Sequence, residues 1–331
     1  MKFIRKKIIR GHSYYYFEFP WRSRGERSIF TRFLGKELPS DLAEVIPQCF
    51  NEISRLSEEK IDSSAKKYFA PKAILPIEQA RFWYRGLHHE LFANDLHLFQ
   101  SLFAVLFLLN SNRSEGSRMT RRDIEKIIQR KRKPKTIMDQ EVVNSLAALR
   151  LAFSREMRWN IASMRRLHAF LFDQISPHTA GKLKTENNVI NNESTTDWKS
   201  VRKELKQLLF WFLREKKKGY PPLVALEFHH RFEAIHPFDD GNGRIGRLLF
   251  NAYLLQEGYM PVIFFSENHS TYMDAISQAR HGRKRKLAHY FIKQLVKTRK
   301  AIELYKQEGV LRGGSPQVGQ WEIERGKIRK Y

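Results

Sequence analysis

Residues 236 to 247 carry an unusual concentration of groups that could do chemistry together, and they read His-Pro-Phe-Asp-Asp-Gly-Asn-Gly-Arg-Ile-Gly-Arg. His236 titrates near neutral pH and can take a proton from an attacking hydroxyl. Asp240 offers a hard carboxylate oxygen of the kind that Mg²⁺ prefers. Arg244 and Arg247 lie three residues apart, so on a helix they project toward the same site, where guanidinium groups suit phosphate oxygens. This string therefore suits a polyphosphate, a divalent cation and a hydroxyl nucleophile held together.

The neighbouring residues predict that this string is a loop between two helices. Prolines open a helix that runs from Pro221 to Ile235, because apolar residues recur behind them at helical spacing. Pro237 cannot continue that helix, since it lacks an N–H donor. A second helix follows and stops near Gly258. The glycine-rich turn and the free N–H groups at the start of the second helix form a predicted anion cradle, made by Gly241, Asn242 and Gly243.

The string resembles the Fic family motif, His-Pro-Phe-x-Asp/Glu-Gly-Asn-Gly-Arg-x-x-Arg, at every specified position, and a looser similarity runs from about Pro76 to about Lys300. Fic proteins mostly transfer AMP from ATP to a protein hydroxyl. The resemblance implies that His236 is the base that deprotonates a target Ser, Thr or Tyr, and that Asp240 binds Mg²⁺. It also implies an ATP site made of Gly241, Asn242, Gly243, Arg244, Arg247 and Tyr272, with Tyr272 near the adenine.

A second motif lies far upstream, at residues 111–116, which read Ser-Asn-Arg-Ser-Glu-Gly. It resembles the Ser/Thr-x-x-x-Glu-Gly/Asn pattern of the family's inhibitory helix, with Ser111, Glu115 and Gly116 at the fixed positions. The resemblance implies that Glu115 pairs with Arg247 and blocks the productive pose of the γ-phosphate. Read without the family, the same hexapeptide is a helix end followed by a glycine.

A third segment, residues 181–190, predicts a short β-hairpin, because polar turn residues lie between apolar ones. Fic proteins carry a hairpin flap in this place, which docks the target segment by strand addition. The family often has an aromatic residue and an arginine where this chain has Leu183 and Lys184. The target preference of the flap therefore cannot be derived from the sequence.

The whole chain predicts a mainly α fold: a Fic-type helical core with a β-hairpin flap, plus a small antiparallel β domain at the N-terminus. Three β-prone runs separated by turns predict a three-stranded sheet in that domain. The expected organisation is a β domain over 1–38, a helical linker over 39–75, a Fic domain over 76–300 and a basic tail over 301–331.

Composition sets limits on compartment and partners. The single cysteine, Cys49, excludes an internal disulfide. The apolar run from Leu102 to Leu109 is too short to span a bilayer, which needs about 20 residues, and predicts a buried helix instead. The N-terminus lacks the apolar stretch of a signal peptide. These features predict a cytoplasmic protein without a membrane partner.

The net charge of +25 predicts attraction to nucleic acid or acidic proteins. The basic runs at 130–135, 216–218 and 283–286 are scattered, however, and none is interleaved along the chain with aromatic residues that stack bases. A solvated basic face is the favoured interpretation. Five other histidines lie within helical patterns and are expected to be structural: His88, His89, His168, His229 and His230.

The sequence thus predicts an AMP transferase that uses ATP and Mg²⁺, is inhibited by Glu115, and modifies a target protein or itself. Three alternatives stay open: removal of AMP with the glutamate orienting a water, transfer of another phosphate-linked group, and a nucleic-acid-associated regulator that binds a nucleotide without turnover. A homodimer is also open.

Overall fold

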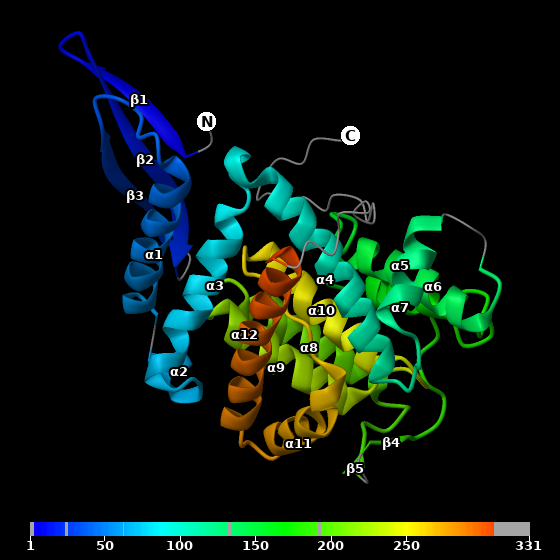
Figure 1. Ribbon diagram of the computed structural model, residues 1–331. Helices are drawn as coiled ribbons and strands as arrows, with labels where there is room; N and C mark the ends of the chain where they lie inside the picture. The colour runs from blue at the N-terminus through cyan, green and yellow to red at the C-terminus, as the bar shows by residue number, and fades with distance from the viewer. Residues whose placement is uncertain (1–2, 24–25, 62, 131–133, 191–192, 308–331) are drawn as a thin grey trace.

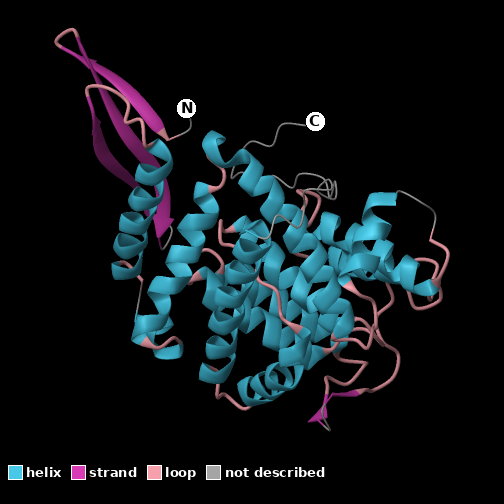
Figure 2. Ribbon diagram, in the orientation of Figure 1, coloured by secondary structure: helices cyan, strands magenta, loops and turns pink. Residues whose placement is uncertain are grey.

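The computed structural model describes residues 3–23, 26–61, 63–130, 134–190 and 193–307 (Figure 1). These residues are mainly helical, with one three-stranded and one two-stranded antiparallel sheet, which confirms the predicted fold class (Figure 2). Of the predicted tail, residues 301–307 complete the last helix, while 308–331 lie outside the described residues.

The N-terminal sheet consists of β1 (Ile4–Ile9), β2 (His12–Ser23) and β3 (Glu26–Gly35), in the order β1-β2-β3. Successive side chains of a strand point to opposite faces, and in β2 this alternation buries Phe17, Phe19 and Trp21 on one face. They pack against α1 (Leu42–Glu59) and against Phe82 of α3 (Ile74–Gly86). Between these helices lies the short α2 (Ser63–Tyr68). The predicted three-stranded sheet is therefore confirmed, and it has a small core of its own.

The helical body is built around α4 (Ala93–Arg113), which is buried from Phe99 to Asn112. A helix surrounded by other helices has no polar face, which explains the uninterrupted apolar run in the sequence. None of the helices in the described residues combines the length and the hydropathy that crossing a bilayer would require. The remaining helices of the body are α5 (Arg121–Arg130), α6 (Ile137–Ala152), α7 (Ile161–Phe172), α8 (Val201–Glu215), α9 (Pro221–Ile235), α10 (Asn242–Gln256), α11 (His269–Arg280) and α12 (Arg285–Gln307).

The two helices that flank the 236–247 string form as predicted. Pro221 occupies the first turn of α9, where a missing N–H costs nothing. After α10, Gly258 takes a left-handed φ of 75° that ends the helix. Both helices are buried along most of their length, and α10 lies beside α9 in the centre of the body (Figure 1). The loop between them is therefore fixed at both ends by the core.

A two-stranded hairpin lies before α8, formed by β4 (Val189–Ile190) and β5 (Glu193–Ser194). The predicted range of 181–190 contains only its first strand, and residues 183–188 are not part of a strand. In Figure 1 the hairpin projects from the body on the same side as α11.

Candidate active site

The loop between α9 and α10 is shaped by two left-handed residues and one asparagine. His236 has φ 49°, and its N–H donates to the carbonyl of Phe232 at 2.9 Å, closing α9. Gly241 has φ 74° and leads into α10. The Asn242 side chain accepts from the N–H of Phe238 at 2.9 Å and donates to its carbonyl at 2.8 Å. This bridge fixes the conformation of the residues between His236 and α10.

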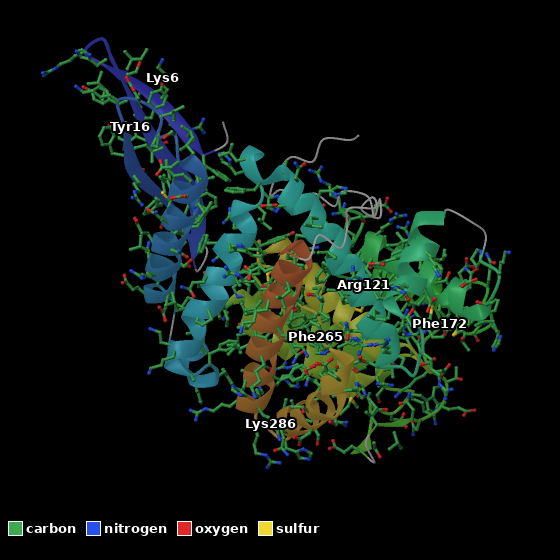
Figure 3. All side chains as sticks on the ribbon, viewed as in Figure 1. Lys6, Tyr16, Arg121, Phe172, Phe265 and Lys286 are labelled. Carbon is green, nitrogen blue, oxygen red and sulfur yellow. The ribbon has the colours of Figure 1, made fainter. Side chains whose placement is uncertain are left out.

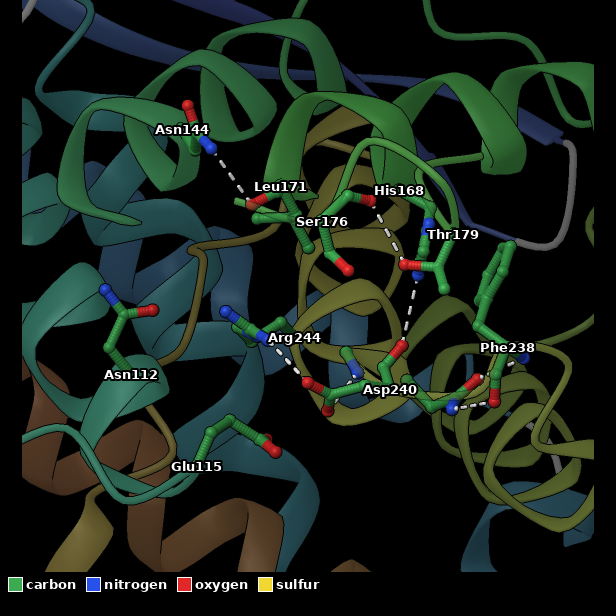
Figure 4. Close-up of polar contacts among 12 residues, drawn as sticks. Asn112, Glu115, Asn144, His168, Leu171, Ser176, Thr179, Phe238, Asp240 and Arg244 are labelled. Carbon is green, nitrogen blue, oxygen red and sulfur yellow. Dashed lines mark hydrogen bonds and ion pairs between the residues drawn. The ribbon is translucent and has the colours of Figure 1, made fainter. Parts of the chain in front are cut away.

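His168 supports the loop from the side of α7. Its ring stacks on Phe238 with centroids 4.1 Å apart. Its Nδ1 accepts from the N–H of Gly181 at 2.9 Å, so Nε2 carries the proton and donates to the carbonyl of Asp240 at 3.1 Å (Figure 4). Burial lowers the pKa of His168 to about 4, which keeps the ring neutral. His168 is structural, as expected, but its contact with this loop joins residues 72 positions apart and could not be predicted from a local pattern.

His236 itself is a neutral imidazole. Burial, and then the charge of Lys184, lower its pKa to about 4. The ring therefore stays unprotonated at pH 7 and can accept a proton from a substrate hydroxyl.

Arg247 and Glu115 form the ion pair that the two motifs imply. Arg247 Nη2 donates to Glu115 Oε1 at 2.7 Å and to the carbonyl of Ser111 at 3.0 Å. Its Nε donates to the Ser111 hydroxyl at 3.1 Å. Burial would raise the pKa of Glu115, but the charge of Arg247 and its hydrogen bond hold that pKa below the ordinary value. The pair thus joins the end of α4 to the buried first turns of α10, and Gly116 follows with a left-handed φ of 93°.

Arg244 and Asp240 are two further charged residues of the site, and the charge of Arg244, in addition to that of Arg247, helps to lower the pKa of Glu115. Their closest atoms, Arg244 Nη2 and Asp240 Oδ2, are 3.5 Å apart, and the Asp240 side chain is 67% exposed. Arg244 is buried, with its guanidinium 5.0 Å from the ring of Phe172. Its Nε has no hydrogen-bond partner among the described residues. A buried cation with an unused donor is suited to an anionic ligand.

Gly243 lies where the backbone passes directly against the ion pair. A Cβ at this position would be 2.6 Å from Glu115 Oε1 and 2.9 Å from Arg247 Nη1. Only glycine leaves room for the pair there. The predicted cradle residues are therefore brought together with Glu115, Arg244 and Arg247 at one helix N-terminus.

Tyr272, which the resemblance places near the adenine, is a buried side chain. It lies on α11, with its hydroxyl 2.9 Å from Nε2 of His229. Its ring packs between Phe264 and Tyr290, at centroid distances of 5.6 and 5.7 Å. Tyr272 is thus enclosed by other side chains of the core.

Glu233 is a buried carboxyl group that sequence reasoning missed. Burial raises its pKa to about 7, and its Oε1 has no hydrogen bond within the described part of the chain. A Cβ on Gly246 would collide with that oxygen and lie 3.0 Å from Cε1 of His229. The available signal was an acidic residue three positions before His236, within an otherwise apolar helical pattern.

Lys184 was predicted only as part of the flap, and its burial beside the loop was not foreseen. Its side chain is only 2% exposed. Its Nζ donates to Asn188 Oδ1 at 2.8 Å and to Thr195 Oγ1 at 2.6 Å, while its N–H donates to the carbonyl of Pro237 at 2.9 Å. Lys184 therefore ties both sides of the β4–β5 segment to the loop beside His236.

A metal ion at this site would need the phosphates of a bound substrate as ligands in addition to the protein. Among residues 3–307 as far as they are described, no group of three or more His, Cys, Asp or Glu side chains could hold a metal. Asp240 offers a single exposed carboxylate, which fits the way that Mg²⁺ binds through one or two carboxylates together with substrate phosphates.

Comparison with known proteins connects this geometry to one family. The profile of the Fic/DOC family matches residues 159–254, which contain α9, the loop and most of α10. A protein adenylyltransferase Fic from Nematostella vectensis is 26% identical over 243 residues, covering 70% of this chain and 52% of the relative. The protein adenylyltransferase fic-1 of Caenorhabditis elegans is 28% identical over 159 residues, covering 46% of this chain and 31% of the relative. The chain thus spans about half, or less, of the length of these relatives.

Solved structures show the same fold. A Fic domain-containing signaling protein from Bacteroides thetaiotaomicron superposes with a TM-score of 0.62 at 23% identity, covering 72% of this chain and all of that one (100%). Fic-1 from C. elegans superposes with a TM-score of 0.60 at 21% identity, covering 81% and 83%.

Proposed function

We propose that the chain is a protein adenylyltransferase, because the profile of the Fic/DOC family matches residues 159–254. It moves AMP from ATP to a hydroxyl of a target protein. One observation carries the proposal: a neutral histidine, an exposed carboxylate and two buried arginines surround one helix N-terminus. Those groups are His236, Asp240, Arg244 and Arg247.

The nucleotide fits the turn that leads into α10. Backbone N–H groups at a helix N-terminus attract anions, and Arg244 offers an unused donor there. Gly243 leaves no side chain between the backbone and the guanidinium of Arg247. Asp240 would hold Mg²⁺, whose charge would offset that of the phosphates.

His236 supplies the proton transfer. It accepts the proton of the target Ser, Thr or Tyr hydroxyl while that oxygen attacks the α-phosphorus. A bond forms between the hydroxyl oxygen and the α-phosphorus, the bond to the bridging oxygen breaks, and pyrophosphate leaves. The two arginines stabilise charge on the phosphates, so catalysis consists mostly of positioning and electrostatics.

Glu115 restrains this reaction. Arg247 is buried and cannot bind a γ-phosphate and Glu115 with the same donor. Breaking a buried pair from one side leaves an uncompensated charge, so the pair is a strong restraint until an anion replaces the carboxylate. Removal of Glu115 frees the guanidinium without adding a competing group.

The test uses two labels. Glu115→Gly protein is incubated with ATP labelled at the α-phosphate and, in parallel, at the γ-phosphate, alone and with a cell lysate. AMP transfer labels protein only from the α-position, first as self-modification. The matched control is the Glu115→Gly, His236→Ala double variant, which should incorporate no label. Incorporation from the γ-position would indicate phosphoryl transfer and overturn the proposal, as would no incorporation from either label.

A further inference from the structure

The face of the N-terminal sheet that points away from α1 gathers aromatic and basic side chains from all three strands. The register pairs Arg5 of β1 with Tyr16 of β2, and Tyr16 with Phe33 of β3. In the next row Lys7 pairs with Tyr14. Directly paired residues lie on the same face of a sheet, so these side chains form one surface, which we call the outer face. It consists of Arg5, Lys7, Tyr14, Tyr16, Glu18 and Phe33, and Lys7 forms an ion pair with Glu18 at 2.7 Å that a phosphate would have to replace.

The rings of the outer face contact one another, and Phe33 is exposed while Tyr14 and Tyr16 are partly exposed. Phe33 lies 5.3 Å from Tyr16 and 6.2 Å from Tyr14, measured between ring centroids, and is 55% exposed. The Nζ of Lys7 lies 4.6 Å from the centre of the Tyr16 ring. The opposite face already supplies the core of this sheet through Phe17 and Phe19. Packing of the sheet on α1 therefore does not explain an exposed aromatic cluster on the outer face.

The charge of this region identifies the kind of partner that fits. Residues 1–38 contain ten Lys and Arg against three Glu. Such a surface attracts a polyanion, and exposed rings next to cations are what unpaired bases stack on. A duplex would use the cations but not the rings, because its bases are already stacked. An acidic protein would also leave the ring faces unused.

We propose that the outer face binds single-stranded nucleic acid, with bases stacked on Phe33 and the tyrosines and the phosphates near Arg5 and Lys7. The basic runs at 130–135, 216–218 and 283–286 lie outside this sheet, and along the sequence none of them is interleaved with aromatic residues. In the N-terminal sheet, by contrast, the pairing of the strands places basic side chains of β1 next to aromatic side chains of β2 and β3. Tyr16, labelled in Figure 3, belongs to this surface, and the sheet that carries it projects from the body that contains the proposed transfer site.

The first measurement is fluorescence anisotropy with labelled single-stranded DNA, single-stranded RNA and a duplex of the same sequence, using the full chain. Both single strands should bind more tightly than the duplex. Phe33→Leu keeps an apolar side chain but removes the ring, and should weaken single-strand binding about tenfold, whereas Phe33→Tyr should retain it. Arg5→Ala should weaken binding and reduce its dependence on salt.

Matched controls come from another part of the chain. Phe210 on α8 is 72% exposed, and Lys217 belongs to a separate basic run. Phe210→Leu and Lys217→Ala should bind as the parent does, and circular dichroism should show that each variant folds. The proposal fails if Phe33→Leu binds like the parent, if the duplex binds as tightly as the single strands, or if polyglutamate displaces the oligonucleotide at equal charge. His236→Ala should bind normally, which separates this result from the fate of the proposed transferase activity.

Discussion

At His236 the backbone adopts a left-handed conformation, with φ 49° and ψ 65°, that few residues other than glycine take. Such a conformation costs about 1 kcal/mol and persists only where surrounding contacts enforce it. Here the hydrogen bond to Phe232 and the fixed loop beyond Pro237 enforce it. The histidine is placed by its backbone, and its proton affinity is set separately by burial.

His236→Ala should reduce AMP transfer by about 10²- to 10⁴-fold, because general-base catalysis contributes that much. ATP affinity should change little, since other groups hold the phosphates. Single-turnover rates and equilibrium binding of ATP, both in the Glu115→Gly background, measure the two quantities separately. Undiminished transfer would show that the base lies elsewhere.

Asp240→Asn should behave differently from His236→Ala. It keeps the shape of the side chain but removes the charge that a cation needs, so ATP affinity should lose its dependence on Mg²⁺. Titration of ATP binding with and without Mg²⁺ measures this. Asp239→Asn is the matched control, because Asp239 is also exposed and lies next in the chain. An equal loss in both variants would count against Asp240 as the specific ligand.

Some residues of the site could be identified from the sequence, and others could not. His236, Asp240 and the arginines belong to one contiguous string, so a pattern search finds them. Glu233 and Lys184 act through contacts that only the folded chain creates, for example Lys184 with Thr195. No local pattern separates a buried lysine with neutral partners from a solvated one.

At the scale of elements, the helix ends and the presence of a hairpin were predictable, but the positions of the hairpin strands were not. Proline and glycine mark the limits of α9 and α10 through restrictions on their own backbone. The polar residues 186–188 suggested a hairpin turn. Instead, Asn187 donates to Asp197 at 3.0 Å and accepts from the N–H of Trp198 at 2.9 Å. These asparagines anchor the segment, and the strands form only after them.

Lys184→Met should loosen the β4–β5 segment, because methionine fills similar space but cannot donate to Asn188 and Thr195. The amides of residues 188–196 should exchange with deuterium about tenfold faster, for a loss of about 1.4 kcal/mol in local stability. Hydrogen-exchange mass spectrometry measures this. Lys182→Met, at a nearby exposed position, is the control and should leave exchange unchanged.

The ion pair between Glu115 at the end of α4 and Arg247 of α10 predicts that the effect of replacing Glu115 on self-modification depends on Arg247. Glu115→Gly should raise self-modification, and adding Arg247→Ala should return it to the parent level or below, because the gain relies on the freed guanidinium. Rates of AMP incorporation in the parent, both single variants and the double variant form the cycle. A double variant as active as Glu115→Gly would show that Arg247 does not hold the phosphate.

For the whole molecule, buried histidines predict acid sensitivity. Burial lowers the pKa of His168 and His236 to about 4 and that of His229 to about 3, from an ordinary value of 6.5. Below pH 6.5 the unfolded chain gains protons that the folded protein does not, so the free energy of unfolding should fall as pH falls from 6.5 toward 4.

Glu233 acts in the opposite sense, because its pKa is raised from 4.5 to about 7. Its stabilising contribution is complete below pH 4.5 and is lost as pH rises through 7. Glu233→Gln should therefore make the acid-induced loss of stability steeper between pH 6.5 and 4.5. Urea unfolding at several pH values measures the slope, and an unchanged slope would mean that Glu233 is already ionised there.

Helix α3 belongs to both cores of the molecule. Phe82 packs among the sheet and α1, while Ile77 and Tyr84 of the same helix pack in the helical body. Helix α3 therefore connects the core of the N-terminal sheet directly to the core of the helical body. The sheet is packed onto the body through α3, and this helix connects the proposed nucleic-acid surface to the part of the chain that contains the loop at His236.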